Sequence, residues 1–123
     1  MSDDSRAARE RQFWSRYTQL LHDQGIKPPF DRWHVLRAEA FIKAFPGRRL
    51  AELGPEDVAG YLSETGRDGA LKPWQFRQVV DAIRILYSVV HTEWAAGFDW
   101  DFWLASAKTH RGGMGALSPL DAG

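Results

Sequence analysis

The stretch LKPWQFRQVVDAIRILYSVVHTEW, residues 71–94, decides the fold because it carries the most regular apolar pattern in the chain. Its apolar side chains recur every three or four residues from Phe76 to Trp94, which predicts one amphipathic helix over 73–94 with a buried face. The first turn is polar and basic, and no acid precedes Asp81. Helix starts usually attract acids, since their unpaired N–H groups make that end positive. A first turn without acids therefore suggests a negatively charged ligand.

Working outward, three more helices are expected over about 4–24, 30–45 and 55–64. Gly25, Pro46-Gly47 and Gly66 stand where the helices would end, and Pro55 suits the first position of the third. A short capping helix is expected from Asp101. We read residues 1–107 as one all-α, four-helix domain and 108–123 as a flexible linker or tail.

The expected buried faces follow the helical spacing. They comprise Phe13, Trp14, Tyr17, Leu20 and Leu21 in the first helix, Trp33, Leu36, Ala40, Phe41 and Ala44 in the second (widened by Val35, Ile42 and Phe45), Val58, Tyr61 and Leu62 in the third, and Phe76, Val79, Val80, Ile83, Leu86, Tyr87, Val90 and Trp94 in the fourth.

Composition excludes several classes of site. The chain of 123 residues has no cysteine and four scattered histidines, so no disulfide framework and no metal site are expected. No apolar run approaches the ~20 residues of a membrane span, and the polar start predicts no signal peptide, so a cytoplasmic setting fits. Formal net charge is zero, which gives no overall basic signature of nucleic-acid binding. Charge is uneven, however: residues 26–45 carry four bases and two acids, and 46–65 carry two bases and four acids.

No motif for catalysis is present. The chain contains no GxSxG, HExxH or phosphate-binding loop, and its three tyrosines fall on apolar helix faces, where core packing is expected. Neither an active site nor a cofactor is predicted. Among the tryptophans, Trp100 and Trp103 are expected to pin the last segment onto the bundle. Trp74 is either a lid on the core or a surface wedge.

Two polar segments are candidates for binding. Gln75, Gln78 and Ala82 are expected to share one outward face of the fourth helix, and Arg77, Asp81, Arg84 and His91 the adjoining one. Glutamine and arginine can read base edges, and arginine and lysine bind phosphates. The alternative is an ordinary solvated face with Arg77 and Arg84 tethered to Asp81. The basic start of the second helix, with Lys27, Arg32 and Arg37, is equally open to both interpretations.

The order of these segments resembles a known family. The stretch RAEAFIKAFPGRRLAELGPEDVAGYLSETGRDG, residues 37–69, followed by LKPWQFRQVVDAIRILY, residues 71–87, is similar to the N-terminal core-binding domain of tyrosine recombinases, in the integron-integrase-like branch of the phage integrase family. The resemblance covers about 30–103. It implies a SAM-like four-helix fold that forms half of a C-shaped clamp on double-stranded DNA, the other half being a catalytic domain.

The resemblance also implies which residues face the recombination site. Two contact regions match, and they contain Lys27, Arg32, His34 and Arg37 in the first and Lys72, Gln75, Arg77, Gln78 and Arg84 in the second. Trp74 departs from the small polar residue expected there, and the neutral overall charge departs from many relatives. Other recombinase protomers on the DNA are implied as partners.

The catalytic half of such a protein is not expected in this chain. No HxxR box is present, and Tyr87 matches a core position and not the nucleophile. The sequence therefore predicts a non-catalytic domain cut from a longer integrase. The alternative function is a SAM-like protein–protein interaction domain that uses its C-terminal aromatic residues for docking.

Overall fold

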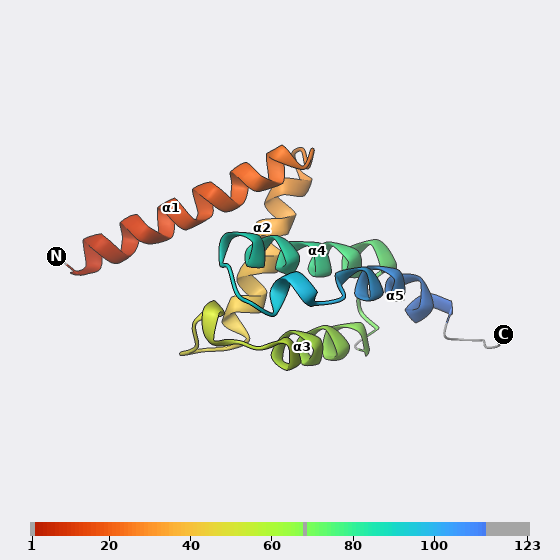
Figure 1. Ribbon diagram of the computed structural model, residues 1–123. Coiled ribbons are helices and arrows are strands. Elements are labelled where there is room, and N and C mark those ends of the chain that lie inside the picture. The colour runs from red at the N-terminus through yellow and green to blue at the C-terminus, as the bar shows by residue number, and fades with distance from the viewer. Residues whose placement is uncertain (1, 68, 113–123) are drawn as a thin grey trace.

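The computed structural model describes residues 2–67 and 69–112, with side chains for 5–67 and 69–106. Within these two ranges, five α-helices and two short 3₁₀ segments follow one another (Figure 1). They are α1 (Ser2–Asp23), α2 (Phe30–Lys43), η1 (Leu50–Glu52), α3 (Pro55–Arg67), α4 (Pro73–Val89), η2 (Ala95–Gly97) and α5 (Trp100–Gly112). No strand occurs in these two ranges, so the all-α prediction is confirmed. α5 extends into the predicted tail, whose remainder, 113–123, lies outside the described residues.

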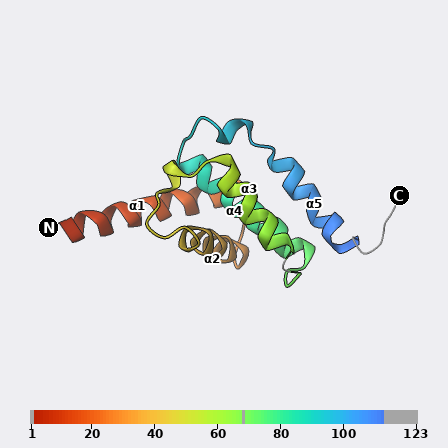
Figure 2. The same cartoon turned by 90° about the horizontal axis from the view of Figure 1, so that it is seen from below.

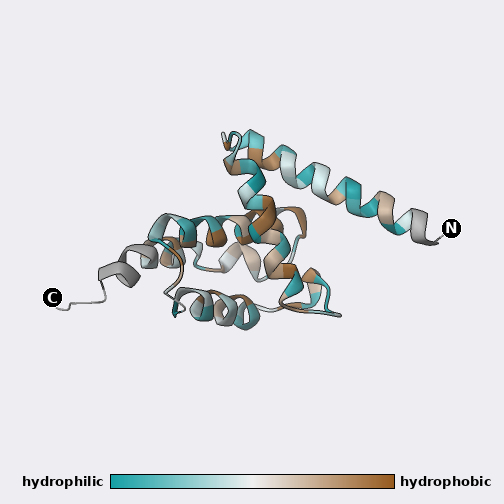
Figure 3. Ribbon diagram, turned by 180° about the vertical axis from the view of Figure 1, so that it is seen from behind, coloured by the Kyte–Doolittle hydropathy of each residue, from teal (hydrophilic) through white to brown (hydrophobic). Residues whose placement is uncertain are grey.

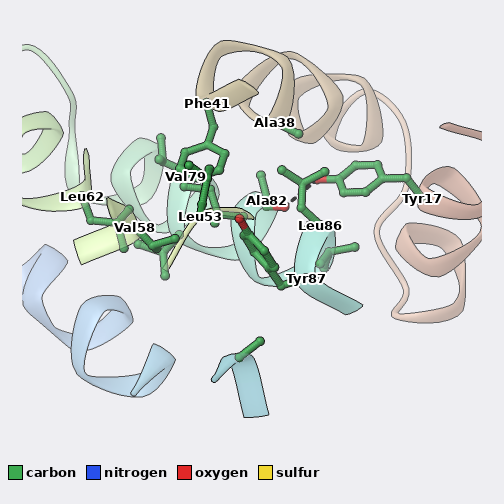
Figure 4. Close-up of a cluster of buried hydrophobic side chains, with 14 of the residues drawn as sticks. Tyr17, Ala38, Phe41, Leu53, Val58, Leu62, Val79, Ala82, Leu86 and Tyr87 are labelled. Carbon is green, nitrogen blue, oxygen red and sulfur yellow. Dashed lines mark hydrogen bonds between the residues drawn. The ribbon is translucent and has the colours of Figure 1, made fainter. Parts of the chain in front are cut away.

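Helix α4 is the centre of the bundle. It packs against α1, α2, α3 and α5, as Figures 1 and 2 show from two sides. Nine of its residues are buried, including Ile83, Ile85 and Leu86, which have no exposed surface. Figure 4 shows Tyr17 and Phe41 entering the core from α1 and α2 toward this helix. The periodic stretch that opened the sequence is thus the element on which the others assemble.

The turn after α1 explains the angle at which α2 leaves it. Gly25 has φ of 83°, a left-handed conformation that glycine adopts without strain. Its N–H donates to the His22 carbonyl at 2.9 Å, and the Ile26 N–H donates to the Leu21 carbonyl at 2.9 Å. This pair of bonds is the Schellman arrangement that ends helices. α1 and α2 consequently diverge from a common corner (Figure 1).

The predicted end of the fourth helix is wrong by five residues. α4 stops at Val89, and Val90 is extended, with φ of −97° and ψ of 102°. Val89, Val90 and Thr92 are β-branched, and such residues lose side-chain freedom in a helix. Trp94 still reaches the core by a different path. Its ring centroid lies 4.8 Å from that of Tyr87, and its indole N–H donates to the Leu53 carbonyl at 3.0 Å.

The predicted buried face of α2 is also wrong in part. Phe41 is fully buried as expected, but Trp33 is 36% exposed and Leu36 is 52% exposed. The inward positions are instead those of His34, Ala38 and Phe41. The face of α2 that points into the core is therefore the one that carries His34, Ala38 and Phe41. Trp33 and Leu36 are left exposed to solvent.

The C-terminal part packs as predicted. Trp100 and Trp103 contact the core as partly buried side chains, and the Trp100 indole N–H donates to the Ala95 carbonyl at 3.1 Å. Tyr17 and Tyr87 are buried as expected. Within the described part of the chain, no helix has the length and hydropathy that crossing a membrane requires.

Candidate functional site

Four large apolar side chains are exposed where α2 meets the start of α4. We call Phe30, Trp33, Leu36 and Trp74 the aromatic surface; their exposed fractions are 47%, 36%, 52% and 46%. Phe30 and Trp33 meet edge to face with ring centroids 5.4 Å apart, and Trp33 and Trp74 lie 5.8 Å apart at a tilt of 32°. Trp74 is thus a surface residue and not a lid on the core.

A small cleft of about 320 Å³ opens within this surface. Arg37 and Gln75, two of the predicted contact residues, line it together with Trp33 and Trp74. The packing of the two indoles therefore brings one residue from each predicted contact region, Arg37 and Gln75, to the same cleft, although more than 30 residues of sequence separate them.

Five of the nine predicted contact residues are basic side chains that remain accessible. Lys27, Arg32, Lys72 and Arg77 are exposed, and Arg37 is partly exposed. Among the described residues, none of the five forms an ion pair. Cations without internal partners can bind phosphate without first breaking an ion pair.

His34 was predicted to contact DNA, and the structure contradicts this. The residue is only 6% exposed. Its Nδ1 lies 2.8 Å from the Phe30 carbonyl oxygen, and its Nε2 lies 3.1 Å from Oδ2 of Asp81. One ring nitrogen thus meets a carbonyl of α2 itself and the other meets a carboxylate of α4. The imidazole joins these two helices and is not exposed to a ligand.

Arg84 is held inside the same hydrogen-bond network. Its guanidinium donates to Asp81 and to Gln24 at the end of α1, the latter at 2.8 Å. The tether to Asp81 that we considered as the alternative is therefore confirmed for Arg84. It is absent for Arg77, for which no bond to Asp81 is found in the described region. The His34–Asp81–Arg84 network, as we call these three residues, joins α1, α2 and α4.

This network controls the ionisation of Asp81. Burial opposes the charged form, but hydrogen bonds from His34 and Arg84 outweigh that cost and hold the pKa of Asp81 below its usual value. The side chain of Asp81 is 23% exposed and that of Arg84 is 31% exposed. The Asp81 carboxylate is therefore stabilised mainly by its hydrogen bonds with His34 and Arg84. These bonds help to hold the packed helices together.

The two glutamines do not form the outward reading face that was predicted. Gln78 is 8% exposed and Ala82 is fully buried, and Oε1 of Gln78 has no hydrogen-bond partner among the described residues. Oε1 of Gln75 accepts the Lys72 backbone N–H at 2.8 Å, which caps the start of α4. Reading adenine requires both ends of an exposed amide, so neither side chain is free to do so in this conformation.

The tyrosines have the environments of core residues. Burial raises the pKa of the Tyr87 hydroxyl to about 12, and burial likewise raises the pKa of Tyr17. The Tyr87 hydroxyl donates to the Leu50 carbonyl at 2.8 Å, and that of Tyr17 donates to the Ala82 carbonyl at 2.9 Å. Both phenols are thereby kept neutral, which disfavours a nucleophilic role.

Replacing Asp81 by asparagine is expected to lower the free energy of unfolding by about 1.5–3 kcal/mol at pH 7, the value of hydrogen bonds to a charged group. Because the folded pKa is depressed, the native state binds fewer protons than the unfolded state, whose carboxyl titrates near about 3.9. The stabilisation is therefore complete above that pH and is lost as pH falls through it to the folded pKa. Urea denaturation should show the same gap in unfolding free energy between wild type and variant at pH 7 and 5, and a smaller gap at pH 3.

Asp101→Asn is the matched control, because Asp101 is exposed on α5 and its carboxyl has no bond within the described part of the chain. It should leave the acid dependence unchanged. A difference between wild type and Asp81→Asn that stayed constant from pH 7 to 3 would show that the carboxylate charge does not stabilise the fold.

A second basic region was not predicted from the sequence. Arg6, Arg9 and Arg11 of α1 and Lys43, Arg48 and Arg49 of the facing wall line a groove between α1 and the segment from α2 to η1. The adjacent pair Arg48-Arg49 and the arginine-rich first helix were visible signals, but only the corner at Gly25 places them opposite each other. Within the described side chains, no group of three or more histidines or carboxylates could hold a metal ion.

Comparison of the chain with protein-family models, with curated proteins and with solved structures gives no match.

Proposed function

We propose that this chain is the DNA-binding, core-binding domain of a site-specific tyrosine recombinase of the integron-integrase type. The observation that carries the proposal is the meeting of the two basic segments. Lys27 precedes α2, Arg32 and Arg37 lie in its first eight residues, and Lys72 and Arg77 lie at the start of α4. The Trp33–Trp74 contact joins the two segments. Five accessible cations on two segments joined in this way favour binding to a phosphate backbone.

The arrangement favours positioning on DNA over reading its sequence. Phosphate contacts fix the register of a protein on the duplex, whereas contacts to base edges specify sequence. With Gln78 buried and Oε1 of Gln75 engaged, the arginines Arg32, Arg37 and Arg77 are the predicted contact residues left that could reach a base edge. In this proposal the domain grips the recombination half-site, and a separate catalytic domain cuts and joins the strands. It would act in the bacterial cytoplasm on a mobile genetic element, beside other recombinase protomers.

The proposal is tested by titrating the ¹⁵N-labelled chain with a short duplex and following amide shifts. Shifts should concentrate at residues 27–37 and 72–77, with affinity in the non-specific range of about 10⁻⁴–10⁻⁶ M. Arg77→Ala should weaken binding by a similar factor on every sequence and reduce the salt slope by about one. Gln78→Ala should alter stability and leave sequence preference unchanged.

Arg67→Ala is the control, because Arg67 is an exposed arginine at the end of α3 that does not line the cleft. It should leave affinity within about twofold. Shifts confined to Phe98–Leu104, or no shift at millimolar duplex, would rule out DNA binding by α2 and α4.

The aromatic surface favours protein docking as a second candidate function. Exposed Trp and Phe side chains commonly anchor protein interfaces. The two candidates respond differently to salt, since counterion release weakens DNA binding steeply and hardly affects an apolar interface. The Trp74→Ala variant, measured over a range of salt concentrations, distinguishes the two functions. If the variant loses affinity for a protein partner by a factor that does not change with salt, docking is favoured.

A further inference from the structure

A groove of about 1360 Å³ runs along α1 from Arg6 to His22 and separates it from the end of α2 and the segment leading into η1. It exists because α1 leans away from the bundle while α2 runs into it, as Figures 1 and 2 show. Of the groove's walls, one is α1 and the other is formed by α2 and the chain around Arg48 and Leu50. This groove is separate from the aromatic surface.

The floor of the groove is apolar. Phe13 and Trp14 of α1 contribute to it from one side, and Ile42 and Leu50 from the other. All four are partly buried and pack against the hydrophobic core. In Figure 3 the coloured part of α1 is mostly hydrophilic or neutral before its end, whereas apolar segments recur in the helices of the bundle. The groove thus offers an apolar strip along its base.

The rims of the groove are strongly basic, although the chain as a whole is neutral. Six cations line it against two carboxylates, Glu10 and Glu39. Of the cations, Arg48 alone is paired, with Asp57 at 3.4 Å; in the described region the other five have no ion pair. They are Arg6, Arg9, Arg11, Lys43 and Arg49. An occupant must therefore be acidic along both edges.

We propose that this groove is a docking site for an acidic amphipathic helix of a partner protein. A helix of roughly 10 Å diameter that rises about 1.5 Å per residue would fill 1360 Å³ with about three turns. Its apolar stripe would cover Phe13, Trp14, Ile42 and Leu50, and its carboxylates would meet the cations on both rims. A helix laid in a groove by an apolar stripe is a common recognition mode. A nucleic acid would satisfy the rims but leave the apolar floor without a matching surface.

The probe is a fluorescein-labelled helical peptide of about 14 residues, with leucines spaced i, i+3, i+4 and i+7 and glutamates at the remaining positions. Fluorescence anisotropy with the full chain should show binding at least about tenfold tighter than for a peptide of the same composition with scrambled order. A third peptide with lysine in place of glutamate should not bind. Amide shifts should map to residues 6–19 and 42–50.

The double variant Arg9→Glu, Lys43→Glu reverses one exposed charge on each rim and should weaken the acidic peptide by about tenfold or more. Arg16→Glu is the matched control, because Arg16 is an exposed arginine of α1 that does not line the groove; it should change affinity by less than about twofold. Circular dichroism should give the same thermal midpoint for all three proteins, so that a change in binding is not a change in folding.

Three results would overturn the proposal. The first is no peptide binding at millimolar concentration, or equal loss with Arg16→Glu. The second is duplex or single-stranded DNA that shifts residues 6–19 and 42–50 and is weakened by the double variant, which would make the groove a nucleic-acid surface. The third is self-association in sedimentation that the double variant abolishes, which would make a second copy of this chain the occupant. Failure of DNA binding at α2 and α4 would leave this proposal unaffected.

Discussion

Phe41→Ala is expected to lower the free energy of unfolding by about 3–5 kcal/mol, the usual cost of truncating a buried phenylalanine. Phe41 has no exposed surface, and its ring lies 5.0 Å from that of Tyr61 and 5.2 Å from that of Phe45. Removing it leaves a cavity where α2, α3 and α4 meet, and the aromatic rings around it lose their contacts. Urea denaturation monitored by circular dichroism measures the loss.

Leu36→Ala on the same helix is the control. Leu36 is 52% exposed, so its truncation should change stability by less than about 0.5 kcal/mol. If the two variants lost similar amounts of stability, the face of α2 that points inward would have to include Leu36.

Ile83→Ala is expected to cost about 2–5 kcal/mol, because Ile83 is fully buried on the central helix. Ile83→Val removes only one methylene and should cost about 0.5–1.5 kcal/mol. Since α4 contacts all the other α-helices, the loss should appear equally in tryptophan fluorescence and in circular dichroism. A loss below about 1 kcal/mol for the alanine variant would mean that the wrong face of α4 had been placed inside.

The core of the bundle was largely predictable because α4 has a strong and regular pattern. Phe76, Val80, Ile83 and Leu86 are all buried where their spacing put them, and α3 begins at Pro55 as its first-turn signals indicated. The end of α4 was less predictable. The apolar spacing continues to Trp94, but β-branched residues and the contact of Trp94 with Tyr87 and Leu53 stop the helix at Val89.

The face of α2 could not be predicted from hydrophobicity alone. Trp33 and Leu36 are more apolar than His34 and Ala38, so the pattern favoured burying them. His34 is buried because Asp81, 47 residues away, accepts its hydrogen bond, and a buried polar group is tolerated once it is bonded. Neither sequence position reveals that partner.

Of the candidate site, only the exposure of its basic side chains could be predicted from the sequence. Lysine and arginine near helix starts are exposed almost whatever the packing, so Lys27, Arg32, Lys72 and Arg77 lie where the sequence suggested. Gln78 is buried, since the flank of α4 that carries it is covered. Whether a polar side chain at the edge of an apolar stripe is covered depends on how the neighbouring helices cross, which spacing does not determine.

The leaning first helix has an energetic consequence of its own. Apolar contacts of α1 with the core begin at Phe13, so the turns before it are supported by their own backbone bonds and by the anchored half that follows. Because nucleation is already provided by that half, their helix–coil equilibrium depends on propagation alone, which is close to balanced for ordinary residues. These turns can fray and re-form without any loss of the core packing. A ligand that binds these turns must offset the conformational entropy they lose when they are held helical. Its affinity will therefore be lower than the buried surface area alone would predict.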